Sequence, residues 1–537
     1  MKSGTVLWSG ATFWVACMAT TASATSVDDR LKLEPSKEAA QENAFQIFNS
    51  IHSAMRQWGS SLNHNGLSVF LATVPGGTIL HHGTSQREPP TVPEWLAFDI
   101  EHAEQFARAR MGPPPKTPPP EDADPLMQQL WYRAQRRPPA PEHHQDTKGH
   151  GYLHLYKVTR PLRLLYLDGM SAGNTNMGTL DTQDFLLRGN RSSSIWGELE
   201  RAKALCEILV PLGLDGAIRM EFGFEIIKCD FSDSMEFLKA YQRPVDGDSG
   251  LDGRSNAMLI ETIRAISQRY HGIGGGRVVV DFSSMVSAMF YPVNLTNPDP
   301  ARSQRHLRRL ASVTDEELRV IKSRIENVVL DRVGGTKPSI DWQGVADMII
   351  ARYADRLWNM AEKVDSLEVL QGIVNGLVNT HIDYALEGGR YTQARDNCAA
   401  HYIQFHEALT DEDQLITAAL KFVTGSICET LLQVRKLIVN DPDAGEEAFA
   451  SAKDLLKSLN DKLRWSRWKE CTSCSFDEVC FLPMWPIGDK DSYDRPNCRN
   501  ITTVRKGWDN QYWEPRWGQH GPAKPEDPKV DEGPKDL

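Results

Sequence analysis

Positive charge is in short supply in this sequence of 537 residues. It has 60 lysine and arginine residues against 71 aspartate and glutamate residues, which gives a net charge of −11. A short cluster at residues 302–309 is basic, and its pattern fits a solvated helix face better than a binding stripe. Nucleic acids and anionic membrane surfaces bind clustered positive charge, so we expect neither as the main partner.

Several familiar catalytic signatures are also missing. The sequence has no Gly-x-Ser-x-Gly nucleophile turn, no His-Glu-x-x-His zinc motif and no phosphate-binding loop. A glycine-rich run at residues 272–276 precedes an apolar segment at 278–282. A dinucleotide-binding loop has to follow a strand and open a helix, so this run is interpreted as a linker turn.

After the N-terminus, no segment long enough to span a membrane is free of charge. Lys2 precedes an apolar stretch at residues 6–19, and the small residues Ala22 and Ala24 follow at signal-peptidase spacing. The stretch is shorter than the roughly 20 residues that a membrane-spanning helix needs. We therefore predict a signal peptide over residues 1–24, no membrane anchor, and a secreted, extracellular protein.

Cysteine is sparse, and its use agrees with secretion. Without Cys17, which lies in the predicted signal peptide, eight cysteines remain, an even number that suits four disulfides in an oxidising compartment. Proximity along the chain favours two pairs, Cys206 with Cys229 and Cys398 with Cys428. Sequons for N-glycosylation occur at three further positions. They are Asn190, Asn294 and Asn500.

The last four cysteines lie close together and predict a small disulfide-rich module. They are Cys471, Cys474, Cys480 and Cys498. The spacing of Cys471 and Cys474 also permits zinc, but no histidine follows at a ligand-like interval. We therefore predict disulfides here and no metal.

The length and pattern of the chain predict about two or three folded units. Strand-like and helical segments alternate over residues 25–245, interrupted by a proline-rich insertion at 111–150. Amphipathic stretches, including 342–364, 411–439 and 446–463, and a capping box from Thr314 to Glu317 make residues 246–463 mostly helical. The Cys-rich module occupies residues 464–500, and a tail that we expect to be disordered occupies 501–537.

Three short segments could surround one nucleotide-binding cleft. Residues 78–84 form a strand-like segment, residues 95–107 have the form of a strand followed by a helix, and residues 223–231 form a late strand. In this order they resemble the core of the ADP-ribosyltransferase fold, over roughly residues 65–235. The resemblance implies an α/β (α+β) domain with NAD as its substrate.

The resemblance also implies roles for individual residues. The family's histidine, which hydrogen-bonds the adenosine ribose of NAD, matches His82. Gly83 matches the glycine that lets the backbone approach nicotinamide, and Thr84 lies beside it. Glu225 matches the glutamate that binds the nicotinamide ribose.

A carboxylate beside the ribose has a clear chemical purpose. Cleavage of nicotinamide from NAD passes through an oxocarbenium-like state, which a fixed negative charge stabilises. The same carboxylate can orient or deprotonate an incoming nucleophile. Glu225 is the first candidate, and Glu221, four residues earlier, is the rival. We interpret His102, on the helical part of the second segment, as a partly exposed packing residue.

The sequence departs from the family pattern at two places. The second motif lacks the usual tyrosine or Ser-Thr-Ser run, which leaves Trp95 or Phe98 to stack on nicotinamide. Gly223 stands where arginine-modifying members carry a second glutamate. The first hypothesis is a secreted toxin or effector that cleaves NAD and transfers ADP-ribose to an unknown acceptor or to water. The alternative is a catalytically inactive secreted binding or structural protein that retains the fold.

Overall fold

The computed structural model describes most of the chain, in ten stretches. They are residues 33–108, 150–194, 197–244, 255–267, 269–298, 306–333, 337–403, 407–440, 445–507 and 511–513. The expected signal peptide and nearly all of the proline-rich insertion lie outside these residues. The described residues from Pro35 onward belong to one compact unit.

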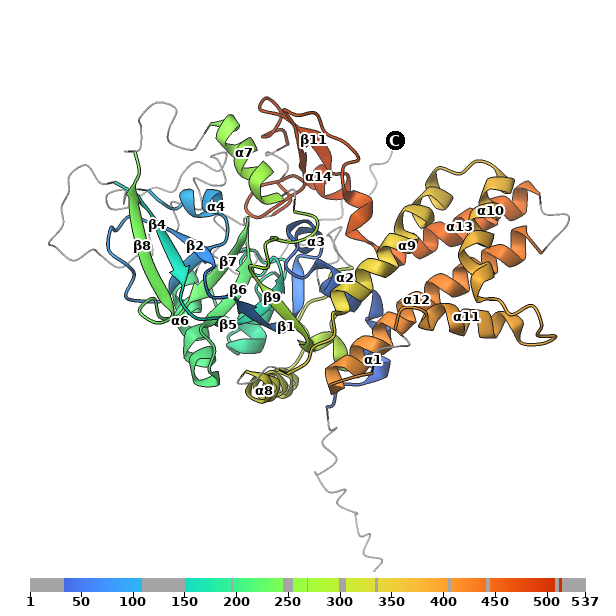
Figure 1. Cartoon of the computed structure of the whole chain (residues 1–537), viewed down its shortest axis with the longest axis horizontal. Helices are drawn as coiled ribbons and strands as arrows, with labels where there is room; N and C mark the ends of the chain where they lie inside the picture. The colour runs from blue at the N-terminus through green and yellow to red at the C-terminus, as the bar shows by residue number, and fades with distance from the viewer. Residues whose placement is uncertain are drawn as a thin grey trace, which may run out of the picture. The chain divides into compact units, whose positions relative to one another are not determined.

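The fold is mixed α/β and is organised around a nine-stranded sheet (Figure 1). In spatial order its strands are β8 (Met235–Gln242), β4 (Tyr152–Val158), β2 (Ile79–Thr84), β3 (Glu94–Ala97), β7 (Phe224–Lys228), β6 (Gly216–Met220), β5 (Leu162–Gly169), β1 (Asn65–Val74) and β9 (Val279–Ser287). Neighbouring strands are antiparallel except β5 and β6, which are parallel. Strand β9 lies within the region expected to be helical, so the sheet extends beyond residue 245.

The central strands β6 and β7 are buried along their whole length, and most of their residues are apolar. Helix α6 (Glu198–Leu209) packs against β6, and α2 (Ala44–Ser53) and α3 (Gln57–Leu62) pack against β5. The backbone N–H of Met55 donates to the Tyr166 hydroxyl at 3.1 Å, which ties the α2–α3 connection to the sheet. Helix α4 (Ile100–Glu104) packs against β2.

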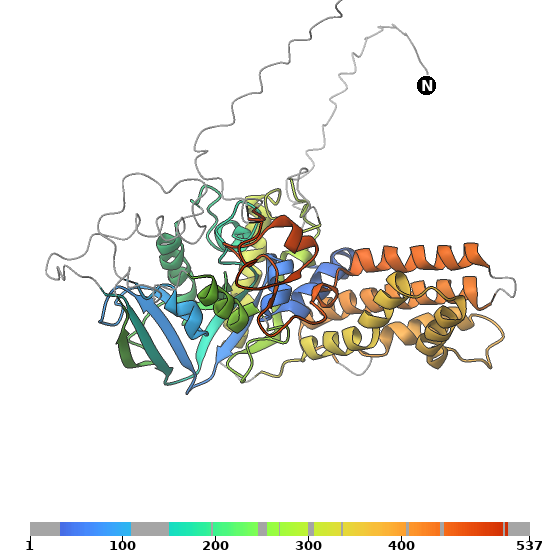
Figure 2. The ribbon, with the colours of Figure 1, turned by 90° about the horizontal axis from the view of Figure 1, so that it is seen from above.

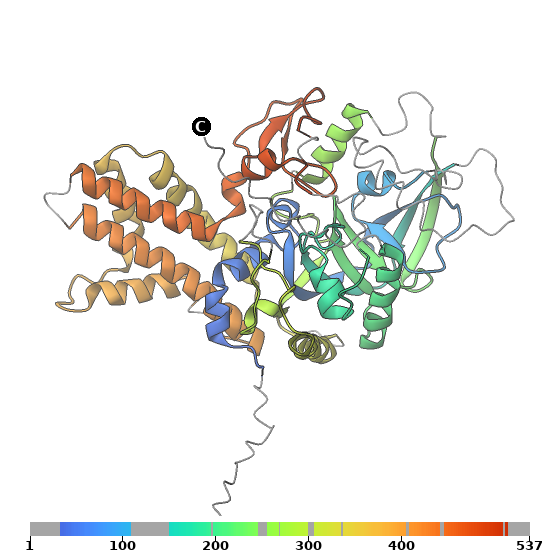
Figure 3. The same cartoon turned by 180° about the vertical axis from the view of Figure 1, so that it is seen from behind.

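In the described part of the chain, six α-helices follow β9 before the Cys-rich module. They are α8 (Asp315–Arg332), α9 (Trp342–Glu362), α10 (Leu367–Val378), α11 (Arg390–Ala400), α12 (Asp411–Ile438) and α13 (Glu446–Leu463). Figure 2 shows α9, α12 and α13 side by side, and Figure 3 shows them from behind. The predicted capping box is confirmed, because Thr314 and Glu317 cap α8 reciprocally.

Helix α12 is the central element of these helices. By its length and composition alone, α12 could span a membrane, but its most apolar 18-residue segment is 61% buried inside the protein. It contacts α10, α11 and α13, and also α1 (Lys37–Glu42) and α2 from the N-terminal region. The first helices of the chain therefore contribute to the packing of the helical region as well as to that of the sheet.

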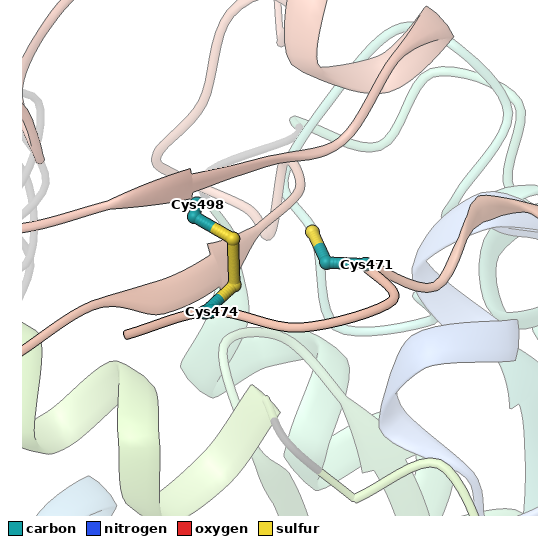
Figure 4. Close-up of side chains that lie close together, drawn as sticks. All are labelled: Cys471, Cys474 and Cys498. Atoms are coloured by element: carbon teal, nitrogen blue, oxygen red, sulfur yellow. A yellow bond between two sulfur atoms is a disulfide. The ribbon is translucent and has the colours of Figure 1, made fainter. Parts of the chain in front are cut away.

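All eight described cysteines form disulfides. Cys206–Cys229 and Cys398–Cys428 confirm the two pairs favoured by proximity. The last four cysteines pair as Cys471–Cys480 and Cys474–Cys498 beside the short strands β10 (Val479–Phe481) and β11 (Asn497–Arg499). Figure 4 shows the Cys474–Cys498 bond with Cys471 next to it. Because the sulfurs are bonded to one another, no thiolate of this set is available for zinc.

The expected start of a disordered tail at residue 501 is too early. Val504, Tyr512 and Trp513 are buried. The Tyr512 ring stacks on Tyr493 with centroids 4.3 Å apart, and its hydroxyl lies 2.9 Å from Nε2 of His64. The aromatic side chains after residue 500 thus pack against the start of the sheet, which a composition rich in proline and charge did not indicate.

Candidate functional site

The three segments that could surround a nucleotide contribute neighbouring strands. Strand β3 lies between β2 and β7, paired with β2 through His81 and Ala97 and with β7 over four residue pairs. Residues about 140 positions apart in the sequence are thus brought to neighbouring strands. The register of these strands then decides which side chains can act together.

The register separates His82 from Glu225. His81 opposes Ala97, Ala97 opposes Glu225, and Glu225 opposes Arg219 on β6. Directly opposed residues point to one face of a sheet, and successive residues alternate. His81 therefore shares a face with Glu225, and His82 points to the other face. The expectation that His82 and Glu225 face one cleft is wrong for this register.

His82 is held on its own face. It is buried, and its Nδ1 lies 2.7 Å from the backbone oxygen of Trp95. Its ring lies 5.6 Å from that of His154 and 5.8 Å from that of Phe231. Thr84, two residues further on, accepts a hydrogen bond from the Gln86 backbone at 3.3 Å.

Gly83 has a packing role. A Cβ built there would lie 2.0 Å from the backbone oxygen of Ala103 and 2.7 Å from the nitrogen of Ala107. Only glycine allows α4 and the residues after it to approach β2 this closely. The surface of Gly83 that the resemblance assigns to nicotinamide is therefore covered by the chain itself.

The two candidate stacking residues differ in their surroundings. Trp95 is half-buried on the face of Glu225, two residues before Ala97 in β3. Phe98 is buried, and the guanidinium of Arg277 lies 5.9 Å from its ring centroid. The same Arg277 donates to the Phe98 backbone oxygen at 2.8 Å. One face of Phe98 is thus already in contact with a cation.

Glu225 lies in a buried ionic network centred on Arg219. The Arg219 side chain is 0% exposed, and its Nε and Nη2 donate to Oε1 of Glu225 at 3.1 and 2.8 Å. Nη2 also lies 2.6 Å from Oε2 of Glu198, and Nη1 donates to Gln183 at 2.9 Å. Burial alone would lower the pKa of Arg219, but Glu198 and Glu225 raise it above its ordinary value.

The network continues to a second buried arginine. Arg201 lies on α6, as does Glu198, with which it forms an ion pair. It also donates to both carboxylate oxygens of Asp184, at 2.9 and 2.8 Å. Asp184, on the π-helix Thr182–Leu187, pairs further with Arg188 at 2.6 Å. Three carboxylates thus meet three guanidinium groups. Because an unpaired buried charge costs free energy, equal numbers of positive and negative groups allow these side chains to remain in the interior.

Apart from Glu225, the residues of this network were missed from the sequence. Arg219 stands between Ile218 and Met220 in an apolar strand, and a cation in that position needs a buried carboxylate partner. That signal could have identified Arg219. Glu198 and Asp184 come from a helix and a π-helix elsewhere in the chain and gave no comparable signal.

Glu221, the rival carboxylate, is also paired. Its Oε1 lies 3.1 Å from Nε2 of His102, and both side chains are 2% exposed. The interpretation of His102 as partly exposed is therefore wrong. Burial lowers the pKa of His102, but the hydrogen bond and charge of Glu221, with smaller effects of Glu225 and Asp99, raise it above its ordinary value.

His102, Glu221 and Glu225 are the residues here that could hold a metal ion. Each offers one ligand atom, and these atoms lie within 4.8 Å of one another. His102 and Glu221 already satisfy each other, and Arg219 already neutralises Glu225. A cation would have to displace these partners next to a fixed guanidinium, so the donor set does not fit a metal well.

Comparison with known proteins finds relatives in yeast. A family described as the YPL277C N-terminal domain matches residues 36–245. The Saccharomyces cerevisiae protein YOR389W is 26% identical over 526 residues, covering 83% of each chain. YPL277C from the same organism is 27% identical over 388 residues, which cover 60% of this chain and 76% of the relative. Both are described as uncharacterized proteins, and no solved structure matches significantly.

Proposed function

We propose that this chain is a secreted, non-enzymatic binding or structural protein built on an ADP-ribosyltransferase-like α/β domain. The observation that carries the proposal is the pairing of Glu225 with Arg219 inside the protein. A carboxylate that stabilises an oxocarbenium-like ribose needs its charge free and the sugar within contact. Here the charge is offset by a guanidinium, and Glu225 is 3% exposed.

The position of His82 supports the same proposal. In the resemblance, the histidine and the glutamate act on two parts of one NAD molecule. The strand register puts His82 on the face opposite Glu225, and Gly83 is covered by the backbone of Ala103. Three residues that would have to converge on one ligand are therefore engaged in three separate packing roles.

The second candidate function is NAD cleavage with transfer of ADP-ribose to an unknown acceptor or to water. One specific observation favours it, the adjacency of β2, β3 and β7 in the order that the resemblance implies. This function would require Arg219 to release Glu225 and the chain around α4 to move away from Gly83.

Nicotinamide release from NAD by the purified secreted protein distinguishes the two functions. We expect no release above that of NAD alone, and no heat of NAD binding in a calorimetric titration. Glu225→Gln and Glu221→Gln should leave this null result unchanged. Turnover by the wild-type protein that disappears in Glu225→Gln, while circular dichroism shows that variant to be folded, would establish the enzyme instead.

A further inference from the structure

A cavity of about 50 Å³, lined by both polar and apolar side chains, shares no lining residue with the Glu225 network. It is formed by α2, the start of β1, the end of β5, residues 306–308 and the end of α13. Gly169, with φ +68°, allows β5 to turn directly against β1, since a Cβ there would lie 2.5 Å from the Gly66 nitrogen. The cavity floor is therefore a fixed part of the sheet.

Three cations surround the cavity. They are Arg308, Lys462 and Arg464. None of them forms an ion pair with another residue in the described part of the chain, and Nε of Arg308 is buried without a hydrogen-bond partner. The neighbouring Arg309, by contrast, pairs with Asp181 at 2.8 Å. Lys462 and Arg464 are exposed and Arg308 is half-buried, so the three positive charges are within reach of a dissolved anion.

His306 lines the same cavity and is affected by the positive charge there. It is half-buried on the cavity wall, in a turn and not in the helix expected for this basic cluster. Burial, the charge of Arg464 and the neighbouring His64 hold the pKa of His306 down at about 3. The imidazole is therefore neutral near pH 7 and can exchange hydrogen bonds with a ligand without adding charge.

The floor of the cavity contains a carboxylate, Asp168, in contrast to the three cations around it. Asp168 accepts hydrogen bonds from the Ser68 backbone at 2.9 Å and from the Ser50 hydroxyl. Burial raises the pKa of Asp168 to about 6, and its bonds to these serines oppose that rise. Asn49 and Ser53 line the wall beside it. Hydroxyl groups of a ligand suit this floor, whereas an anionic group suits the cationic rim.

We propose that this cavity binds a small phosphate monoester, with the phosphate against Arg308, Lys462 and Arg464 and the organic hydroxyls toward Asp168 and Ser50. Two guanidinium groups and an ammonium match a phosphate dianion better than a single carboxylate. The cavity has room for about three to five water molecules at roughly 10–15 Å³ each. It can therefore hold one compact group of the ligand, and the rest of the ligand extends past the rim.

Isothermal titration of the full secreted chain with glycerol phosphate tests this site. Inorganic phosphate and glycerol serve as the two partial ligands, and Arg308→Gln, Arg464→Gln and Arg308→Lys as the variants. Lys457→Gln, exposed on the same helix α13 but outside the cavity, is the matched control. Thermal unfolding of each variant verifies that it is folded.

We expect glycerol phosphate to bind more tightly than inorganic phosphate and far more tightly than glycerol. Each Arg→Gln variant should lose about tenfold or more in affinity, since hydrogen bonds to charged groups contribute most at such sites. Arg308→Lys should keep part of the affinity, and Lys457→Gln all of it. Equal affinity in folded Arg308→Gln, or no binding at millimolar concentration, would overturn the site. Inorganic phosphate binding as tightly as the ester would overturn the assignment to an ester.

These outcomes are independent of the NAD assay. The cavity and the Glu225 network use different residues, so nicotinamide release leaves the phosphate titration unaffected. Loss of phosphate binding in Arg308→Gln would in turn say nothing about NAD cleavage.

Discussion

Arg219 and Glu225 oppose each other on the hairpin strands β6 and β7, and the guanidinium donates twice to one carboxylate oxygen, at 3.1 and 2.8 Å. Both side chains lie inside the protein. The residue that the resemblance makes catalytic is thereby one member of a balanced buried network. Replacing or neutralising Glu225 should therefore lower the stability of the folded protein.

Arg219→Met should strongly destabilise the protein. It leaves Glu225 and Glu198 buried without their shared cation, and breaking a buried pair in this way costs about 3–5 kcal/mol of unfolding free energy. Urea unfolding measures it. The control Arg319→Met, an exposed residue paired with Glu316, should change stability by less than about 0.5 kcal/mol. A loss as small as the control's would show that Glu225 is not held as described.

Gly83→Ala should destabilise the contact between β2 and α4. The added Cβ meets the Ala103 backbone oxygen at 2.0 Å, and backbone has to move, which typically costs about 1–3 kcal/mol. Gly76→Ala is the control, because its Cβ would have only an ordinary contact of 3.6 Å. Thermal unfolding of both variants decides the matter. Equal melting temperatures would mean that the surface of Gly83 is open to a ligand after all.

The His102–Glu221 pair should make stability depend on pH. The pKa of His102 is raised in the folded protein above the ordinary 6.5, so its contribution is complete below that pH and is lost as pH rises through the folded pKa. We expect the wild type to lose stability relative to His102→Gln as pH increases above 6.5. Urea midpoints of the two proteins across this range provide the measurement. A constant difference would contradict the raised pKa.

Asp168 should produce a second pH dependence in a lower window. Burial raises its pKa from 3.8 to about 6, so the unfolded chain ionises first and stability falls as pH rises between these values. Asp168→Asn has no such titration. Its stability relative to the wild type should increase across the window by on the order of 3 kcal/mol. The comparison uses the same urea titrations, and a flat difference would argue that Asp168 is more solvated than its position suggests.

Trp513→Ala should show that residues after the Cys-rich module belong to the folded core. Trp513 is 2% exposed, and its ring centroid lies 5.1 Å from that of His64. Truncation of such a residue typically costs about 3–5 kcal/mol. Phe476→Ala, at a side chain that is 97% exposed, should be nearly neutral. If both variants unfold at the wild-type temperature, the packing of Trp513 is not important for stability.

Local signals in the sequence predicted several elements correctly. Spacing within a short segment predicted the Thr314–Glu317 capping box, helices α9, α12 and α13, and the disulfides Cys206–Cys229 and Cys398–Cys428. The edge strand β9 and the packing of Trp513 were not predicted, because each depends on partners far away in the chain.

The candidate site illustrates the limit for individual side chains. Sequence patterns correctly predicted that His82 and Glu225 lie on strands, but the need of Arg219 for a carboxylate partner was missed. The faces of these side chains depend on how the strands pair, because a shift of one residue in strand register moves a side chain to the opposite side of the sheet. Only the tertiary structure decided that Glu198 and Gln183 complete the surroundings of Arg219. Those contacts arise when a helix and a π-helix pack on the sheet, and no local pattern encodes that packing.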